Sequence, residues 1–499
     1  FLRYVCEHAK KKYVVLAPTG IAAINAGGST MHSFFKLPFY PLLPDDPNLS
    51  LQRGRIHEFF KYTKPHRKLL EQIELVIIDE ISMVRADIID AIDRILRVYS
   101  HNLREPFGGK QLLLVGDVFQ LEPVVKNDER EILNRFYPTP YFFSARVFGQ
   151  IDLVSIELQK VYRQTDPVFV SVLDHIRTNT AGAADLQLLN TRYGSQIEES
   201  EADMYITLAT RRDTVDSINE KKLAELPGEP ITFEGVIEGD FPESSLPTSQ
   251  ELVLKPGAQI IFIKNDFDRR WVNGTIGVIA GIDEEEETIY VITDDGKECD
   301  VKLESWRNIR YHYNEKTKEI EEEVLGSFTQ YPIRLAWAIT VHKSQGLTFS
   351  RVVIDFTGGV FAGGQAYVAL SRCTSLDGIQ LKKPVNRADV FVRPEIVNFA
   401  GRFNNRQAID KALKQAQADV QYAAASRAFD KGDMEECLEQ FFRAIHSRYD
   451  IEKPVPRRLI RRKLGIINTL KEQNKKLKEQ MREQQERIPV SYTHLRAHE

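Results

Sequence analysis

Two adjacent carboxylates at the end of an apolar run are the first residues in this sequence with an evident chemical use. Residues 75–83 read LVIIDEISM, so Asp79 and Glu80 directly follow four apolar residues. Carboxylates at the end of a buried strand are energetically costly unless they have a partner. Such a pair can hold Mg²⁺ and orient a water molecule against a nucleotide phosphate. A helix cap or a surface turn is the plain structural alternative, and the pair alone does not exclude it.

A second acidic strand end favours the nucleotide interpretation. The stretch GDVFQLEPV (116–124) places Asp117 after the apolar run QLLLV, and Gln120 follows three residues later. A side-chain amide in that place can contact the terminal phosphate of a nucleotide and report its loss. A Gly-Asp turn would explain this stretch if it stood by itself.

Two arginines far apart in the sequence are candidates for the same site. Arg163 lies in LQKVYRQ, and Arg372 lies in ALSRCTS. From a second domain, both could reach a nucleotide and stabilise the charge on a transferring phosphoryl group. A lone arginine in such a stretch more often makes a surface ion pair.

Two further stretches combine aromatic, hydroxyl and basic side chains. They are APTGIAAINAGGSTMHSFF (17–35) and AWAITVHKSQGLTF (336–349). Groups of these kinds beside a strand end can stack on the bases and bind the phosphates of a single nucleic-acid strand. For residues 17–35 the alternative is a capped helix whose aromatic residues pack in the core. The second cluster is too polar for a core and too dense for an ordinary loop.

Continuous apolar runs predict the elements that position these residues. Runs without polar alternation are typical of strands buried on both faces in a parallel sheet, where functional groups gather at the carboxyl ends. One set of runs lies at 13–19, 75–80 and 111–117, and a second set at 205–210, 333–340 and 351–356. We therefore expect two α/β domains of the same kind.

The rest of the chain has different patterns. Residues 251–313 hold short alternating runs separated by turn residues, which predicts a small antiparallel barrel inserted in the second α/β unit. The acidic run 283–287 is expected to be a solvated hairpin turn. After residue 400 the strands stop, and residues 400–450 resemble a single tetratricopeptide-type helical hairpin.

A basic stretch, RRLIRRK (457–463), begins the last helical segment, which is either an exposed helix or a short coiled coil. One seam position holds Ile460, Ile467, Asn474, Met481 and Ile488, and the other holds Leu470 and Leu477. Lys463 and Gln484 interrupt this heptad. If the coil forms, Asn474 in its core would favour a dimer of fixed register.

Composition limits the class of protein. The 499 residues are 42% hydrophobic and 28% charged, with a net charge of −4, as in an ordinary globular chain. No apolar run approaches the roughly 20 residues of a membrane span. The four scattered cysteines fit a reducing compartment, and we expect a cytoplasmic protein without membrane contact.

Both ends of the sequence look cut or foreign. The start, FLRYVCEHAKKK, has helical spacing without a capping residue, so we expect residue 1 to lie inside a longer natural chain. The end, SYTHLRAHE (within 490–499), breaks the helical pattern, and we expect it to be an artefactual tail.

Taken together and in this order, these stretches resemble the motifs of one family, the superfamily-one DNA helicases of the petite integration frequency (PIF) type, which are related to RecD. The resemblance covers residues 1–385, and KNDFDRRWVNGTIG (264–277) is similar to the barrel that this family inserts. Glu122 departs from the family, which more often has Pro there, and we expect little consequence.

The resemblance implies an α/β fold with two RecA-like parallel-sheet motor domains and a small SH3-like β-barrel insertion. The pattern after residue 400, outside the resemblance, adds an α-helical C-terminal region. The expected ranges are 1–155 for the first motor domain, 156–250 and 326–395 for the second, 251–325 for the barrel, 400–450 for the hairpin and 456–489 for the last helix. The helical region would serve a protein partner or dimerisation.

The resemblance also implies an ATP-dependent helicase that moves 5′ to 3′ on single-stranded DNA and opens forked duplexes. Asp79 would hold Mg²⁺, Glu80 would polarise the attacking water and Gln120 would sense the γ-phosphate. The expected ATP-binding set is Asp79, Gln120, Arg163, Gln345, Gly346 and Arg372. The expected DNA-binding set is Thr19, Gly20, His32, Phe34, Asn273, Thr340, His342 and Lys343.

One part of the nucleotide site is missing from the sequence. The 499 residues hold no G-x-x-x-x-G-K-[ST] loop, whose amides and Lys cradle phosphates. We therefore expect this chain as given to hydrolyse ATP poorly or not at all. A non-catalytic interaction protein acting through its C-terminal helices, or a RecD-like subunit of a nuclease complex, are the alternatives to a helicase.

Overall fold

The computed structural model describes residues 4, 7–8, 11–51, 55–194, 204–314, 316–317, 319–448 and 454–487. Contacts divide the chain into two units. The first contains Phe1–Leu153 and Glu157–Phe403, and the second contains Val154–Ile156 and Asn404–Glu499. Most of the expected first helix and all of the tail 490–499 lie outside the described residues.

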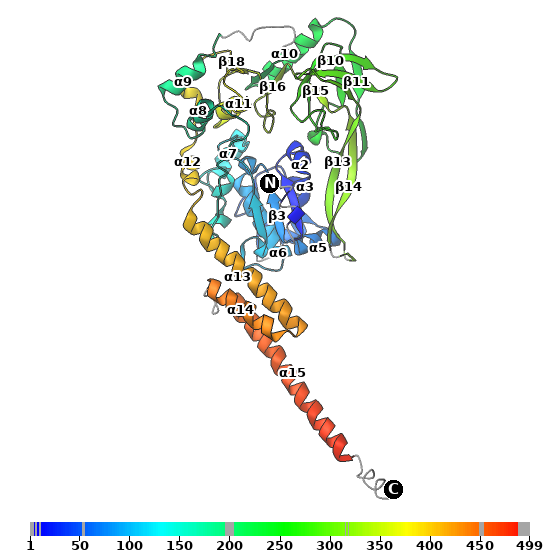
Figure 1. The fold of residues 1–499 in the computed structure, drawn as a ribbon, viewed down its shortest axis with the longest axis vertical. Coiled ribbons are helices and arrows are strands. Elements are labelled where there is room, and N and C mark those ends of the chain that lie inside the picture. The colour runs from blue at the N-terminus through cyan, green and yellow to red at the C-terminus, as the bar shows by residue number, and fades with distance from the viewer. Residues whose placement is uncertain are drawn as a thin grey trace, which may run out of the picture. The chain divides into compact units, whose positions relative to one another are not determined.

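A parallel sheet forms the centre of the first motor domain (Figure 1). Its strands are β1 (Tyr13–Ala17), β2 (Ser29–Thr30), β3 (Leu75–Ile78) and β4 (Gln111–Leu114), in the order β2-β1-β3-β4. All three pairings are parallel, and every residue of β3 is buried, as the continuous apolar run predicted. The helices are α2 (Gly20–Ala26), α3 (Met31–Phe35), α4 (Arg55–Phe60), α5 (Lys64–Gln72), α6 (Ala86–Tyr99) and α7 (Asn127–Leu133).

Helix α6 carries a buried row of carboxylates at a spacing of three residues. Asp87 accepts from the backbone N–H of Leu42, and Asp93 accepts from the N–H of Phe107. Asp90 accepts from the backbone N–H groups of Arg146 and Val147, which come after the last strand of the sheet in sequence. Because each carboxylate satisfies donors of a different loop, this row fixes the loops around the strand ends.

A second parallel sheet has the order β16-β5-β17-β18. Its strands are β5 (Ile206–Ala209), β16 (Ala338–Thr340), β17 (Val352–Asp355) and β18 (Ile379–Leu381). Its helices are α8 (Pro167–Arg177), α9 (Ala183–Asn190), α10 (Arg212–Glu225) and α11 (Gln365–Leu370). The expected pair of α/β motor domains is therefore confirmed.

One predicted strand of this sheet is wrong in its first half. The apolar run 333–340 divides into β15 (Ile333–Leu335), which pairs antiparallel with a barrel strand, and β16, which joins the motor sheet. The chain passes from one sheet to the other at Ala336, whose N–H donates to the carbonyl of Gln259. Both halves are apolar because both sheets bury them.

The antiparallel sheet next to the second motor domain has the order β12-β11-β10-β9-β15. Its remaining strands are β9 (Gln259–Phe262), β10 (Ile276–Asp283), β11 (Thr288–Thr293) and β12 (Glu298–Val301), which enclose a core of their own. The acidic stretch 284–287 is an exposed turn between β10 and β11. Antiparallel pairing begins ahead of residue 251, since β6 (Ile231–Glu234) pairs with β8 (Glu251–Leu254).

A long hairpin links this region to the first motor domain. It consists of β13 (Glu304–Asn314) and β14 (Glu319–Gln330), with β7 (Val236–Gly239) along its base (Figure 1). Tyr311 of β13 is buried in the core of the first motor domain, and its ring centroid lies 6.1 Å from that of Phe34. The hairpin therefore holds the insertion against the first motor domain.

The chain also returns to the first motor domain after the second is complete. Val390 belongs to the second core, whereas Val392, Ile396 and Phe399 belong to the first. Phe399 of α12 (Pro394–Ala400) stacks on Phe143 at a centroid distance of 4.4 Å. We call residues 390–403 the return segment, because it joins the two motor cores.

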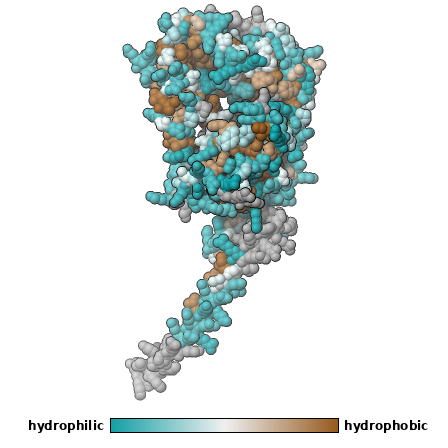
Figure 2. All heavy atoms as spheres, turned by 180° about the vertical axis from the view of Figure 1, so that it is seen from behind, coloured by the Kyte–Doolittle hydropathy of each residue, from teal (hydrophilic) through white to brown (hydrophobic). Residues whose placement is uncertain are grey.

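The second unit is helical, which confirms the expected α-helical C-terminal region. It contains α13 (Arg406–Lys431), α14 (Met434–Arg448) and α15 (Pro454–Arg487). Ala418, Tyr422 and Ala444 form a small core between α13 and α14. Figure 2 shows scattered apolar side chains among hydrophilic ones along α15. Among the described helices, none is long and apolar enough to cross a membrane.

Candidate nucleotide and DNA site

Asp79 and Glu80 lie at the carboxyl end of β3, in a conformation that the surrounding backbone enforces. Glu80 has φ 50° and ψ 45°, the left-handed region, and its N–H donates to Asp79 Oδ1 at 3.0 Å. Such a conformation costs a non-glycine residue about 1 kcal/mol or more. The neighbouring turn is tight as well, because a Cβ on Gly116 would lie 3.0 Å from the backbone nitrogen of Ile81. Strain of this kind is typical of functional sites.

Burial raises the pKa of both carboxyl groups. For Glu80, the charges of Asp79 and Asp117 raise the pKa further, and the Arg372 guanidinium lowers it. Asp79 and Glu80 are thus adjacent carboxylates where water is partly excluded, and their mutual repulsion favours a bound cation. Carboxylate oxygens are the ligands that Mg²⁺ takes from proteins. The donor set at the end of β3 therefore fits a Mg²⁺ ion.

The loop that contains Gln120 belongs to the first domain in sequence but packs against the second. Gln345 Nε2 donates to Gln120 Oε1 at 3.2 Å, and the Tyr367 hydroxyl donates to Asp117 Oδ2 at 3.3 Å. Leu121 is buried in the core of the second domain. The phosphate-sensing candidate is therefore held directly by the second motor domain.

The structure brings Arg163 and Arg372 together. Arg163 Nη1 donates to the carbonyl of Ser371 at 3.2 Å, and Gln164 Nε2 donates to the same carbonyl at 3.0 Å. Arg372 is 1% exposed, and its Nε donates to the carbonyl of Val368. Burial and the charge of Arg163 lower the pKa of Arg372 to about 10. Arg372 of the second domain therefore lies within electrostatic range of Glu80 and Asp117 of the first, with Arg163 bound beside it.

Gln345 and Gly346 lie in the turn after β16. Gly346 has φ +78°, which a residue with a Cβ rarely adopts. The barrel reaches the same turn, since a Cβ on Gly274 would lie 3.6 Å from the side chain of Leu347. Asn273, beside that glycine, donates its N–H to Asn265 Oδ1 at 2.7 Å. The structure thus places the loop of Asn273 next to the turn of Gln345.

Two of the predicted DNA-binding hydroxyls cap turns at strand ends. Thr19 follows β1, and its hydroxyl oxygen accepts from the N–H of Ala22 at the start of α2. Thr340 ends β16, and its hydroxyl oxygen accepts from the N–H of Lys343. Gly20 is the first residue of α2, and a Cβ there would clash with Ser245. Both threonines lie at carboxyl strand ends, as predicted.

The aromatic candidates divide into buried and exposed rings. Phe34 is 4% exposed and packs against Phe35, so in this structure its ring belongs to the core, as the alternative interpretation held. His32 instead stacks on Phe39, with centroids 5.1 Å apart and planes 9° apart, and Phe39 is 84% exposed. An exposed ring stacked on a histidine is an available surface for a base.

A similar pair lies on the second domain. The ring of His342 lies 6.4 Å from that of Phe361, which is 62% exposed. Burial lowers the pKa of His342, and burial and the charge of Arg334 lower the pKa of Lys343. Phe39 and Phe361 were missed in the sequence. The stretch FKLPF contains the first and GGVFAGG the second, but neither pattern distinguishes an exposed ring from a core ring.

Other residues of the interdomain contact were also missed. Arg177 lies 3.8 Å from Asp117, and its guanidinium stacks over the ring of Phe119 at 4.3 Å. A Cβ on Gly364, which has φ +78°, would lie 2.3 Å from the carbonyl oxygen of Phe119. Only glycine permits this approach of the second domain to the loop of the first.

Glu122, the residue that departs from the family pattern, is bound to the return segment. Its carboxylate accepts from Arg393 Nε at 2.7 Å and from the Tyr141 hydroxyl at 3.1 Å. Arg393 belongs to the return segment. The expectation of little consequence stays a prediction, and the ion pair shows that Glu122 is bound to the segment that joins the two motor cores.

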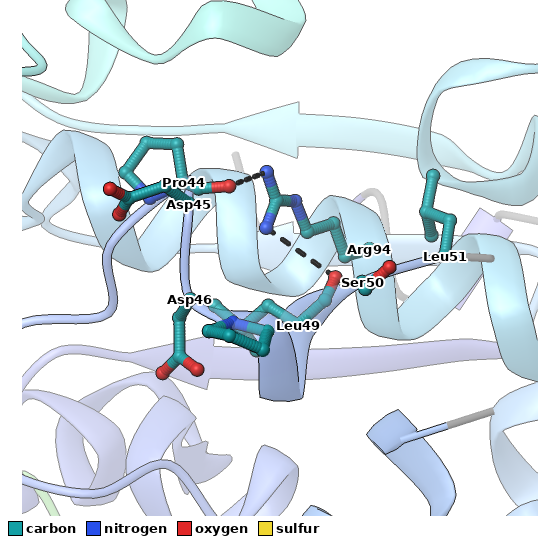
Figure 3. A pocket seen from close by; sticks show the side chains of 8 residues that line it. Pro44, Asp45, Asp46, Leu49, Ser50, Leu51 and Arg94 are labelled. Carbon is teal, nitrogen blue, oxygen red and sulfur yellow. Dashed lines mark hydrogen bonds between the residues drawn. The ribbon is translucent and has the colours of Figure 1, made fainter. Parts of the chain in front are cut away.

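A surface pocket on the first motor domain has a structural explanation. Figure 3 shows Arg94 donating to the carbonyl oxygens of Pro44 and Leu49, at 2.6 Å and 3.4 Å. The pocket is lined by residues 44–47, 49–51 and 94. None of these residues belongs to the predicted nucleotide or DNA sets, and Arg94 serves to hold the loop.

The chain combines two RecA-like sheets, an Asp-Glu pair at a central strand end and a buried arginine from the opposite domain, Arg372. These features define a nucleotide-driven motor of the two-domain class. A model of the PIF1-like helicase family matches residues 2–179. The ATP-dependent DNA helicase Pif1 of Campylobacter jejuni is 34% identical over an alignment of 386 residues, which covers 74% of this chain and 82% of that protein. The chain belongs to the PIF1-like helicase family.

Solved structures of a Bacteroides Pif1 support this assignment. The complex with ADP-AlF4 has a TM-score of 0.73 at 40% identity and covers 80% of this chain and 89% of that one. The same helicase bound to single-stranded DNA has a TM-score of 0.57 at 40% identity, covering 82% and 91%. The matches leave about a fifth of this chain without a counterpart in either structure.

Proposed function

We propose that this chain is the motor of an ATP-dependent DNA helicase that moves 5′ to 3′ on single-stranded DNA and opens forked duplexes. The observation that carries the proposal is the contact in which Glu80 and Gln120 of the first domain meet Arg372 and Gln345 of the second. A nucleotide bound there would contact both domains at once. Related helicases solved with ADP-AlF4 and with single-stranded DNA support this proposal.

In the proposed reaction, Glu80 polarises the water that attacks the γ-phosphate. Its raised pKa suits a carboxylate that accepts a proton during the attack. Arg163 and Arg372 offset the charge that develops on the transferring phosphoryl group, and Gln120 registers its departure. Asp79 would hold Mg²⁺, which when bound neutralises phosphate charge.

Coupling to movement follows from the residues that link the two motor domains. Loss of the γ-phosphate changes the contacts of Gln120, and Gln120 is bonded to Gln345 of the second domain. The turn of Gln345 begins at Thr340, beside the proposed DNA contacts His342 and Lys343. Hydrolysis would thereby alter the grip of the second domain on the strand.

The proposed DNA surface contacts bases and phosphates without reading sequence. The pairs His32–Phe39 and His342–Phe361 offer rings for stacking, and Lys343 offers a charge for a phosphate. Stacking is worth about 1–3 kcal/mol per base and tolerates any base. A translocating motor needs such sequence-independent contacts.

The test requires a protein extended upstream by a phosphate-binding loop, assayed for ATP hydrolysis with and without single-stranded DNA. We expect strong stimulation by DNA. Glu80→Gln should lower the turnover number by about 10²-fold or more, the scale of general-base catalysis. Glu284→Gln, in the exposed turn, is the matched control. Absence of stimulation by DNA in a folded, loop-bearing protein would refute the motor.

The 499-residue chain itself is expected to show little or no turnover, since it lacks the loop that cradles the phosphates. DNA-stimulated hydrolysis by this chain, abolished by Glu80→Gln, would contradict that expectation. Contaminating activity would survive the same substitution.

A further inference from the structure

We propose that the α15 helices of two copies of this chain pair in parallel, in register, as a short coiled coil. The proposal concerns the second unit alone and is independent of the motor function. Three observations support it: an exposed apolar seam, an asparagine in that seam, and the distribution of charge beside it.

The seam consists of side chains at alternating spacings of three and four residues, which bring them to one face of the helix. They are Ile467, Leu470, Asn474, Leu477 and Met481. Leu470 and Leu477 are each 56% exposed, and Met481 is 59% exposed, so no described part of the chain covers this face. Residues 466–487 span about 33 Å of helix, which is three heptads.

The beginning of the seam is defined by contacts within the chain. Lys463 would be the preceding seam residue, but its ammonium bonds Asp430 and lies 4.3 Å from the ring centroid of Phe429 on α13. This part of α15 therefore packs against its own unit. The interruption of the heptad at Lys463 marks where the intramolecular contact ends and the free seam begins.

Asn474 in the middle of the seam indicates that the partner is a second copy of this chain. A buried amide is costly without a hydrogen-bond partner, and the same amide across a two-fold axis supplies one. In a parallel, in-register pair the two Asn474 side chains meet in one layer. In an antiparallel pair the seam position that holds Asn474 in one helix faces the other seam position, which holds Leu470 and Leu477, in its partner. Asn474 would then face leucine instead.

The charges beside the seam also favour the parallel arrangement. The flanking positions hold Lys471 and Lys478 on one side and Gln473 and Gln480 on the other. In a parallel pair the lysine side of one helix faces the glutamine side of the other. Lys478 of one helix therefore lies opposite Gln473 of its partner. An antiparallel pair in which Asn474 faces Leu477 would place Lys471 opposite Lys478, and like charges at such a distance are destabilising.

The test is sedimentation velocity of the full chain over about 1–100 µM, the range in which a weak self-association becomes visible. We expect a concentration-dependent dimer. Leu470→Ala combined with Leu477→Ala should abolish it without unfolding the chain, because both side chains are exposed in the monomer. Lys475→Ala combined with Lys476→Ala, on the other faces of α15, is the matched control and should leave the dimer intact.

Orientation is tested by oxidative cross-linking of single-cysteine substitutions in the full chain. Asn474→Cys should cross-link rapidly to its counterpart, and Lys476→Cys should be at least tenfold slower because it points away from the seam. A monomer at all concentrations would overturn the proposal. So would a dimer that survives the leucine substitutions, or equal cross-linking at positions 474 and 476.

Discussion

The ion pair between Glu122 and Arg393 yields the sharpest prediction for the return segment that joins the two motor cores. Arg393→Ala removes the guanidinium whose Nε lies 2.7 Å from Glu122 Oε2. The Glu122 side chain is 11% exposed, and the Tyr141 hydroxyl would remain as its hydrogen-bond donor. The substitution therefore leaves a largely buried carboxylate with half of its partners.

The magnitude follows from burial. Removing one partner of a fully buried pair costs about 3–5 kcal/mol, and an unsatisfied polar group costs about 1–3 kcal/mol. Arg393 is 37% exposed, so water already screens the pair and reaches the carboxylate when the arginine is gone. We therefore expect Arg393→Ala to lower the free energy of unfolding by about 2 kcal/mol, the middle of the range for an unsatisfied polar group. For a unit of this size the melting midpoint falls by about 2 °C.

The assay is thermal and denaturant unfolding of four proteins: the parent, Arg393→Ala, Glu122→Gln and the double variant. Because Glu122→Gln removes the buried charge, the double variant should recover more than half of the loss, which corresponds to a coupling energy of about 1 kcal/mol or more. Arg402→Ala, an exposed arginine in the same return segment, is the control.

Two results would refute this account. If Arg393→Ala changes stability no more than Arg402→Ala does, the pair is a surface contact. If the effects at Glu122 and Arg393 simply add, the two side chains act independently. Either result would restore the view that Glu122 has little consequence.

Three further predictions concern stability. Burial lowers the pKa of His66 to about 4, so the stability that comes with its neutral form is fully present above the unfolded pKa of 6.5. As the pH falls from 6.5 to 4, the free energy of unfolding should drop by about 3 kcal/mol. His66→Gln should remove this pH dependence in unfolding titrations. Phe399→Ala should cost about 3–4 kcal/mol because it empties the stack on Phe143, whereas Phe399→Leu should cost less than half of that in denaturant unfolding. Asp90→Asn should cost about 1–3 kcal/mol, since a neutral amide oxygen cannot satisfy two backbone N–H donors and the Tyr137 hydroxyl equally well; calorimetry measures this loss.

The parallel sheets could be predicted from the sequence because burial on both faces leaves a local mark. A run such as LVIIDE is apolar at every position until the strand ends, and the polar residues that follow must lie at the carboxyl edge. This reasoning located Asp79, Glu80 and Thr340 correctly. It failed within 333–340, where two buried strands of different sheets are contiguous and nothing local separates them.

Side-chain environment was harder to predict than strand position. Phe34 and Phe39 are five residues apart in one aromatic stretch, yet Phe34 is buried and Phe39 is 84% exposed. The difference arises because β13 covers the first ring, with Tyr311 packed beside it. A hairpin nearly 280 residues away in sequence (311 − 34 = 277) decides which ring is available to a ligand.

The loop that follows β4 explains why this arrangement favours coupling between nucleotide and strand. Asp117 and Gln120 bond side chains of the second domain, Leu121 is buried in the second core, and Glu122 pairs with the return segment. A displacement of this loop by a phosphate cannot be absorbed locally, because Asp117, Gln120 and Leu121 are attached to the other domain and packed interfaces do not deform continuously. The second domain must therefore move with the loop. Weakening Glu122–Arg393 should consequently reduce unwinding more than ATP hydrolysis in a loop-bearing protein, and a proportional loss of both activities would show that the pair serves stability alone.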